Sequence, residues 1–136
     1  MSTRACVHFM KNGDAEAKIY RHSDGYKEGL GQDLLTFLHE LKDNVRDNRF
    51  IDAGYLAAKW VVKDATMNRQ YANGEPHNLN FLGVGIVAKD PTDIEYRYEV
   101  LCDEFNGEGM PKVIMYDLYN GQILNSGQCL NDVVLT

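Results

Sequence analysis

Residues 94–102 have the sequence IEYRYEVLC and carry the clearest strand pattern in the chain. Apolar or aromatic side chains occupy every second position from Ile94 to Cys102, and the positions between them carry mainly charged side chains such as Arg97. Successive side chains of a strand point to opposite faces, so this alternation predicts a strand with one buried side. We therefore expect a sheet that is covered on one face.

An Asn12-Gly13 pair marks a tight turn near the start of the chain. Both residue types tolerate the positive φ angles of a type I′ turn, which joins two antiparallel strands. The pair predicts a hairpin of strands 4–11 and 15–22. The implied register places Lys11 opposite Asp14 and His8 opposite Ala17.

A second Asn-Gly pair, Asn120-Gly121, predicts a hairpin of strands 112–119 and 122–125. Further strands are expected over residues 82–89 and 129–135. Residues 68–80 are polar and carry turn-forming residues, which is typical of a long loop.

Two helices are expected between the first hairpin and the remaining strands. Leucines recur at helical spacing from Leu30 to Leu41, with charged residues on the opposite side. A second helix is expected to begin at Asp52, which is a favourable N-cap. This helix is apolar nearly all round, so it is either central or has one side that meets a partner. The sequence thus predicts a single α+β domain over residues 1–136, with a mostly antiparallel sheet of about five to six strands and two helices on one face.

Charge is distributed unevenly along the chain, whose net charge is −6. Up to residue 70 there are eleven basic and ten acidic residues, and after it three basic and ten acidic. The acidic second half would repel a phosphate backbone and attract a basic protein surface. We therefore expect no direct nucleic-acid contact and expect a protein partner with a basic surface. The alternative to such a partner is that the acidic residues only keep the protein soluble. The residues predicted to contact this basic partner are Glu95, Glu99, Asp103, Glu104, Glu108 and Tyr98.

The three cysteines are widely spaced, and no Cys-x-x-Cys pair is present. We interpret them as buried thiols of a reducing cytoplasm, and expect no disulfide framework. No metal, no cofactor, no membrane segment and no secretory signal is expected. Signatures for phosphate loops, nucleophile elbows and dinucleotide sites are absent, so an enzyme is the less favoured interpretation.

Residues 20–26, with the sequence YRHSDGY, are the chemically richest segment. His22 and Asp24 leave the end of a strand together and match an acid–base pair or part of a metal site. The simpler interpretation is a turn in which Asp24 caps nearby N–H groups. The candidate ligand-site residues are Arg4, Tyr20, His22, Asp24 and Tyr26.

The chain resembles a family of small, uncharacterised phage and prophage proteins in three places. These are the opening Met-Ser-Thr-Arg, the segment from Ile19 to Tyr26 and the later Asp93-Ile94-Glu95-Tyr96-x-Tyr98. The typical motif of this family is Tyr-x-His-x-Asp-Gly-Tyr-Pro-Glu, and Lys27 stands here in the place of the proline. The resemblance covers mainly residues 1–40 and 93–100 and brings no known activity. It implies a phage-like origin and a host cytoplasm.

Three functions are therefore in contention. The first is a non-enzymatic inhibitor that covers a basic surface of a host protein, such as a nucleic-acid-binding defence complex. The second is a small-ligand binder or enzyme that uses His22 and Asp24. The third is a self-assembling homo-oligomer, because sheet edges and the apolar second helix offer contact surfaces.

Overall fold

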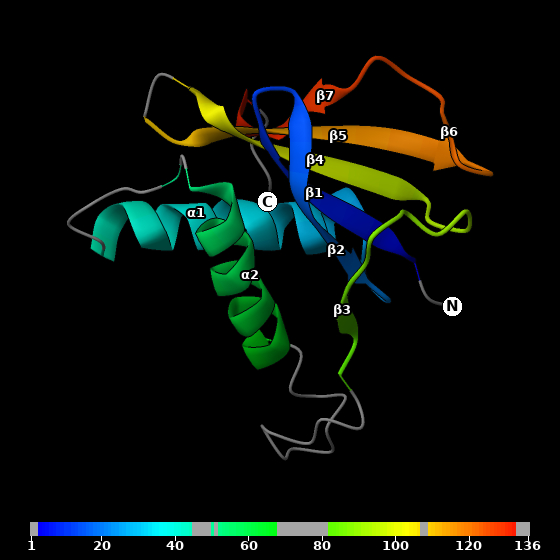
Figure 1. Ribbon diagram of the computed structural model, residues 1–136, viewed down its shortest axis with the longest axis horizontal. Coiled ribbons are helices and arrows are strands. Elements are labelled where there is room, and N and C mark those ends of the chain that lie inside the picture. The colour runs from blue at the N-terminus through cyan, green and yellow to red at the C-terminus, as the bar shows by residue number, and fades with distance from the viewer. Residues whose placement is uncertain (1–2, 45–49, 51, 68–81, 107–108, 133–136) are drawn as a thin grey trace.

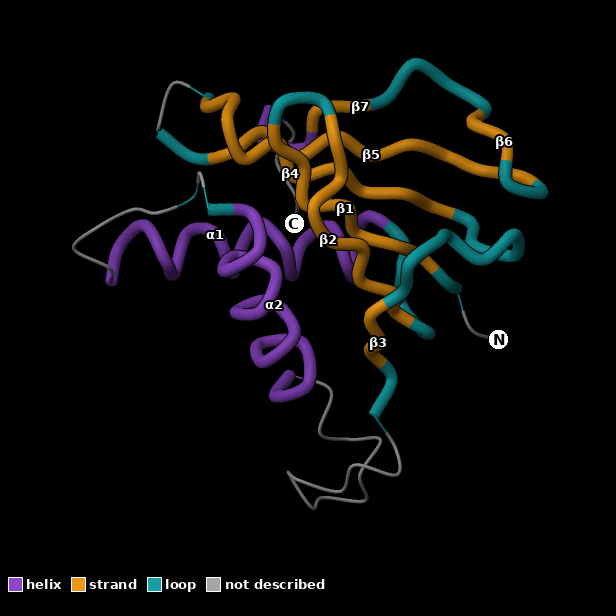
Figure 2. The backbone as a smooth tube through the Cα atoms, viewed as in Figure 1, coloured by secondary structure: helices purple, strands orange, loops and turns teal. Residues whose placement is uncertain are grey.

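The computed structural model describes residues 3–44, 50, 52–67, 82–106 and 109–132. A single sheet carries both helices on one face, as Figures 1 and 2 show, so the expected α+β architecture is confirmed. In chain order the elements are β1 (Ala5–Lys11), β2 (Asp14–Arg21), a π-helical turn (Lys27–Gly31), α1 (Gln32–Asn44), α2 (Ala53–Met67), β3 (Val84–Ile86), β4 (Tyr96–Phe105), β5 (Pro111–Tyr119), β6 (Gln122–Ile123), β7 (Gln128–Cys129) and a 3₁₀ turn (Leu130–Asp132).

The strand order is β3-β2-β1-β4-β5-β6, and β7 also pairs with β5. Neighbouring strands are antiparallel, with the exception of β1 and β4, which run parallel through the centre of the sheet. The sheet is therefore mixed, because the chain passes through α1, α2 and β3 before it returns beside β1. A parallel pair needs such a long connection, whereas tight turns suffice for the two hairpins.

The first hairpin has the predicted turn and an altered register. Asn12 and Gly13 both have positive φ, at 53° and 82°, and Lys11 pairs with Asp14 as expected. His8, however, lies opposite Lys18 and not Ala17. A β-bulge causes this difference, because Glu16 is an extra residue between the partners of Phe9 and Met10.

Strand β1 is covered on both faces. Ala5, Val7 and Phe9 belong to the main core between the sheet and the helices. Trp60 of α2 is fully buried in that core and makes an edge contact with Phe37 of α1, with ring centroids 5.3 Å apart. On the opposite face of the sheet, a second small cluster consists of Cys6, Ile94 and Leu118.

A buried ion-pair group ties both helices to the sheet. The Arg21 guanidinium on β2 lies 2.9 Å from the Asp33 carboxylate on α1 and 3.7 Å from the Asp64 carboxylate on α2. The side chains of Arg21 and Asp64 are only 5% and 1% exposed. One strand and both helices thus meet at one charged contact below the sheet.

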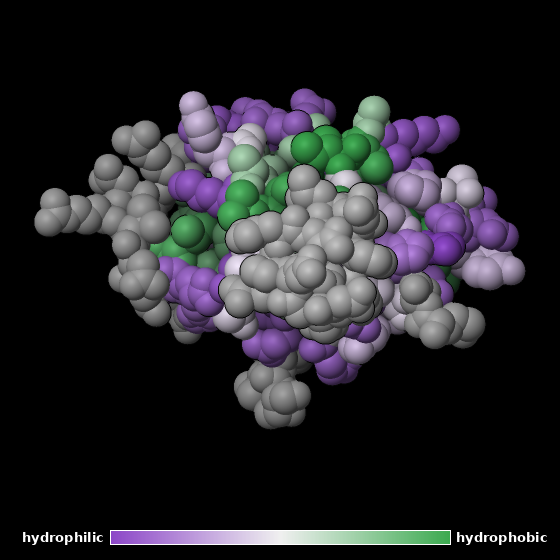
Figure 3. Space-filling model, turned by 90° about the horizontal axis from the view of Figure 1, so that it is seen from below, coloured by the Kyte–Doolittle hydropathy of each residue, from purple (hydrophilic) through white to green (hydrophobic). Residues whose placement is uncertain are grey.

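Helix α2 is not covered all round. Its sheet-facing side buries Leu56, Ala57 and Trp60, whereas Tyr55 and Val62 are about two-thirds exposed, at 70% and 67%. Figure 3, which views the molecule from the helix side, shows hydrophobic residues at the surface. Self-assembly through this surface stays a prediction.

Several predicted elements are shorter than expected. The strand expected over 82–89 is limited to β3, because only Val84–Ile86 pairs with β2. The strand expected over 129–135 is limited to β7 within the described residues, because a 3₁₀ turn begins at Leu130. The loop expected over 68–80 lies outside the described residues.

Candidate functional site

A pocket of about 390 Å³ lies on the sheet face opposite the helices. His8 of β1 opens onto it, while its neighbours Val7 and Phe9 point into the main core. The segment 87–94 crosses from β3 to β4 over this outer face and forms one wall, and the β5–β6 turn forms another. The lining residues are His8, Lys18, Lys89, Asp90, Pro91, Thr92, Ile94, Arg97, Leu118, Asn120 and Gly121.

The β-bulge at Glu16 contributes directly to this site. Because it shifts the register, Lys18 lies opposite His8 and its side chain points to the same face of the sheet. The register predicted from the turn alone would have put Ala17 there. The bulge thus exchanges a methyl group for an ammonium group in the wall of the pocket.

Asp90 clamps the crossing segment onto the sheet. One carboxylate oxygen lies 2.7 Å from His8 Nε2. The other accepts a hydrogen bond from Arg97 Nε at 3.1 Å and lies 3.1 Å from Arg97 Nη2 in the same ion pair. The three side chains are 7%, 15% and 22% exposed for His8, Asp90 and Arg97. Charge-assisted contacts of this kind are among the stronger hydrogen bonds in proteins.

The pKa of the Asp90 carboxyl reflects this clamp. Burial alone would raise that pKa, but the hydrogen bond and charge of His8 and the charge of Arg97 outweigh burial and lower it. Asp90 is therefore an ionised anchor near neutral pH and not a general acid. His8 is likewise engaged through Nε2 with Asp90.

Cys6, which is fully buried, offers no nucleophile. Burial and the nearby Asp90 charge raise the pKa of its thiol to about 12, and burial and Asp103 raise that of Cys102 to about 12 as well. The thiolate is the reactive form of cysteine, so both thiols are unreactive in the folded protein.

This predicts a thiol-titration result. In native protein at pH 8, a chromogenic disulfide reagent will modify Cys129, which is partly exposed, and will leave Cys6 and Cys102 unmodified within minutes. In denaturant all three cysteines will react. Absorbance of the released chromophore measures the number of reactive cysteines in the native and in the denatured protein. Rapid modification of Cys6 in the native state would contradict the buried clamp.

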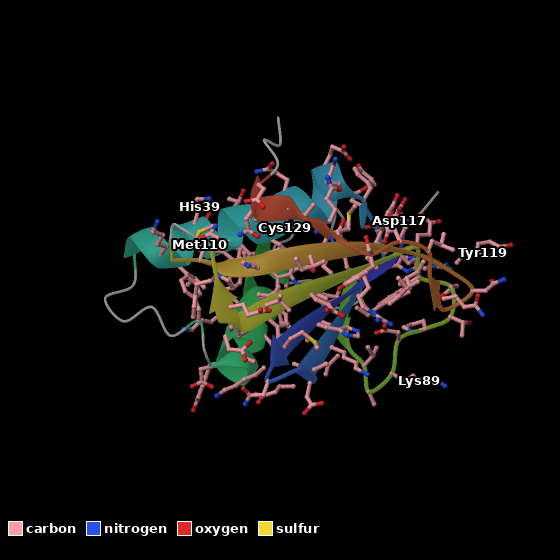
Figure 4. All side chains as sticks on the ribbon, turned by 90° about the horizontal axis from the view of Figure 1, so that it is seen from above. His39, Lys89, Met110, Asp117, Tyr119 and Cys129 are labelled. Atoms are coloured by element: carbon pink, nitrogen blue, oxygen red, sulfur yellow. The ribbon has the colours of Figure 1, made fainter. Side chains whose placement is uncertain are left out.

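The two lysines of the pocket are less constrained than Arg97. Lys18 Nζ reaches the Ala88 carbonyl oxygen at 3.5 Å, and within the described residues neither Lys18 nor Lys89 has an ion-pair partner. Figure 4 shows the Lys89 side chain extending from the connection between β3 and β4, at the same end of the sheet as Asp117 and Tyr119. Both ammonium groups are available for a further contact.

The residues predicted as a ligand site at the first turn make local contacts. Tyr20 Oη lies 3.0 Å from His22 Nδ1, and the Tyr26 hydroxyl donates to Asp24 Oδ1 at 3.4 Å. Arg4 pairs instead with Asp93. None of these five side chains lines the pocket described above.

The same turn has a clear structural role. Asp24 adopts a positive φ of 55°, and its carbonyl oxygen accepts the Leu30 N–H at 2.8 Å. The buried Tyr98 hydroxyl donates to the Gly25 carbonyl oxygen at 2.7 Å. A Cβ at Gly25 would lie 2.8 Å from Ala5 Cβ, so this position needs glycine for close packing. The motif fixes the path from β2 into α1.

The predicted acidic surface is not one patch. Glu95 precedes β4, while Asp103 and Glu104 lie near its far end, so roughly 25 Å separates them at about 3.3 Å per residue. Glu99 lies 4.0 Å from Arg97 Nη1. Glu108 lies outside the described residues.

Tyr98 is a correction to the predicted partner contacts. The sequence pattern placed this tyrosine among the interface residues, but its side chain is fully buried against the helices and its hydroxyl bonds Gly25. Tyr98 faces the core because it shares the buried side of β4 with Val100 and Cys102. It therefore offers no surface to a partner.

Sequence reasoning missed the residues of the pocket. A usable signal was present: only three basic residues follow residue 70, and two of them, Lys89 and Arg97, lie within eight positions of each other and flank an Asp-Pro turn. The contribution of His8 and Lys18 depends on strand register, which the sequence did not determine.

Among the described residues, no group of three or more His, Cys, Asp or Glu side chains is arranged to hold a metal ion. No helix within the described ranges is long and apolar enough to cross a membrane. Comparison with protein-family models, curated proteins and solved structures finds no match to this chain. The resemblance to phage proteins accordingly stays a prediction.

Proposed function

We propose that this protein binds a small molecule in the pocket between the 87–94 segment and the β1–β4–β5 face. One observation carries the proposal: the pocket has charged, polar and apolar walls and is fixed in shape by the Asp90 clamp. A volume of about 390 Å³ lies within the range of small-molecule sites.

Binding without chemical conversion fits the site better than catalysis. Asp90 is held as an ionised anchor, His8 is bonded to it, and the adjacent Cys6 thiol has a pKa of about 12. A nucleophile paired with an available base is thus lacking among the described residues of the pocket.

A fragment screen followed by protein NMR tests this proposal. We expect members of a diverse set of neutral and charged fragments to shift the backbone amides of His8, Thr92 and Gly121. The variant Thr92→Trp fills the pocket from an exposed lining position and should abolish these shifts. Thr36→Trp, an exposed position on α1, is the matched control and should keep them. Absence of any binder, or equal binding by Thr92→Trp, would refute the proposal.

We also propose that the protein binds a basic protein surface, through fewer acidic residues than the sequence predicted. It is supported by exposed carboxylates at the far end of the sheet, where Asp103 accepts the Asn12 N–H at 2.9 Å and thus lies beside Asp14 and Glu16 of the first hairpin. Such a group favours encounter with a basic protein surface, as a host target of a phage inhibitor would present.

Pull-down from host lysate at low and high salt tests this second proposal. Capture of a partner should weaken with salt and should be lost in Asp103→Asn/Glu104→Gln. The control Asp132→Asn removes an exposed charge elsewhere and should have no effect. Capture that is insensitive to salt and to the double substitution would exclude the acidic end as the contact.

A further inference from the structure

We infer that the ligand of the outer-face pocket is a small organic anion with an apolar body. This inference rests on the proposed function and specifies the chemical class of the ligand. It follows from three features of the pocket, namely an excess of cations, the prior engagement of its one carboxylate, and an apolar wall.

The pocket has an excess of basic side chains, although the protein as a whole is acidic. The protein has a net charge of −6, yet Lys18, Lys89 and Arg97 line this one cavity, against the single lining carboxylate of Asp90. Glu99 lies 4.0 Å from Arg97 Nη1, and it does not line the pocket. Even with Glu99 counted, cations outnumber carboxylates, so the cavity is a locally positive site on an acidic protein.

Asp90 does not satisfy the two lysines. Its oxygens are directed to His8 on one side and to Arg97 on the other. An ammonium group has three donors, and Lys18 makes one long contact to a carbonyl oxygen. A carboxylate or phosphate group on a ligand would supply the acceptors that these ammonium groups lack within the described residues.

The remaining wall of the pocket is apolar. Ile94 and Leu118 are buried members of the second cluster, and Pro91 adds an apolar ring at the edge. Burial of apolar ligand surface against such a wall is favourable by roughly 25 cal/mol per Å². An inorganic ion would leave this wall unused, whereas an aliphatic or aromatic acid would cover it.

The test is an NMR titration of the whole chain with four probes: phenyl phosphate, benzoate, neutral benzamide and inorganic phosphate. We expect the two aromatic anions to shift the pocket amides with at least about tenfold higher affinity than benzamide, equivalent to about 1.4 kcal/mol. Their affinity should fall as salt rises. Phenyl phosphate should bind more tightly than inorganic phosphate.

Charge variants locate the effect. Lys18→Gln/Lys89→Gln should lose at least about tenfold in affinity for both aromatic anions. Lys112→Gln removes one lysine charge from the outer face outside the pocket and should bind as the wild type does. Benzamide provides an internal check because its affinity should not respond to either change.

The outcomes separate this inference from the proposed function. If neutral fragments bind in the pocket and the anions bind no more tightly than they do, the inferred ligand class is wrong. The proposed function as a small-molecule binder would still hold. Equal affinity of the double variant and the wild type for the anions also overturns the inference. If inorganic phosphate binds as tightly as phenyl phosphate, the apolar body is refuted. If nothing shifts the pocket amides, both the inference and the proposed function fail.

Discussion

Arg21→Met will lose about 3–5 kcal/mol of unfolding free energy, because removal of one partner from a buried ion pair leaves an uncompensated charge. The substitution keeps an apolar stem of similar length but removes the guanidinium that lies between Asp33 and Asp64. Asp64 is 1% exposed and so has no access to bulk water. Urea unfolding followed by circular dichroism measures the loss.

Two further variants make this result interpretable. Arg21→Met/Asp64→Leu removes both buried charges and should recover a large part of the loss, because a buried ion pair and an apolar pair are often similar in stability. Lys63→Gln breaks the surface pair with Glu40 and should cost less than about 1 kcal/mol. A loss below about 1 kcal/mol in Arg21→Met would show that the ion-pair group does not hold the helices.

Asp90→Asn will lose about 2–4 kcal/mol at pH 7, which is less than for Arg21→Met because Arg97 is 22% exposed and keeps contact with water. The amide carries no charge to pair with the Arg97 guanidinium, so the 87–94 segment will detach from the sheet face more readily. Asp93→Asn is the matched control, since Asp93 forms an exposed pair with Arg4 and should cost less than about 1 kcal/mol.

The contribution of Asp90 also depends on pH. Its pKa in the folded protein lies below the usual value of 3.8, so its stabilising effect is fully present above that value. The effect is lost as the pH falls through the lower folded pKa. The stability difference between the wild type and Asp90→Asn should therefore shrink between pH 5 and about pH 2. A difference that stays constant over this interval would show that Asp90 is not held as a carboxylate.

The sequence predicted the elements of the fold well where a local pattern determines structure. The alternation in 94–102, the leucine spacing of α1 and the two Asn-Gly turns each identify an element from a few neighbouring residues. The parallel pairing of β1 and β4 was not predicted, because it joins segments about ninety residues apart and leaves no local signature.

The candidate site was less predictable for the same reason. His8, Lys18, Asp90 and Arg97 come from four separate segments and meet through strand pairing and a crossing connection. The placement of Lys18 depends on one extra residue in β2. Neither Glu16 nor its two neighbours in the sequence is a glycine, which would have indicated a bulge. By contrast, YRHSDGY attracted attention through composition, and its glycine and aspartate serve the turn into α1.

The central parallel pair has a consequence for biosynthesis. Strand β1 is translated before β4, its partner on one side, and both helices are made in between. Until then β1 can pair with β2 alone, and one edge of that hairpin is without its native neighbour. Between the synthesis of β2 and that of β4, the nascent chain therefore presents an unpaired strand edge, which is a site where another strand can pair.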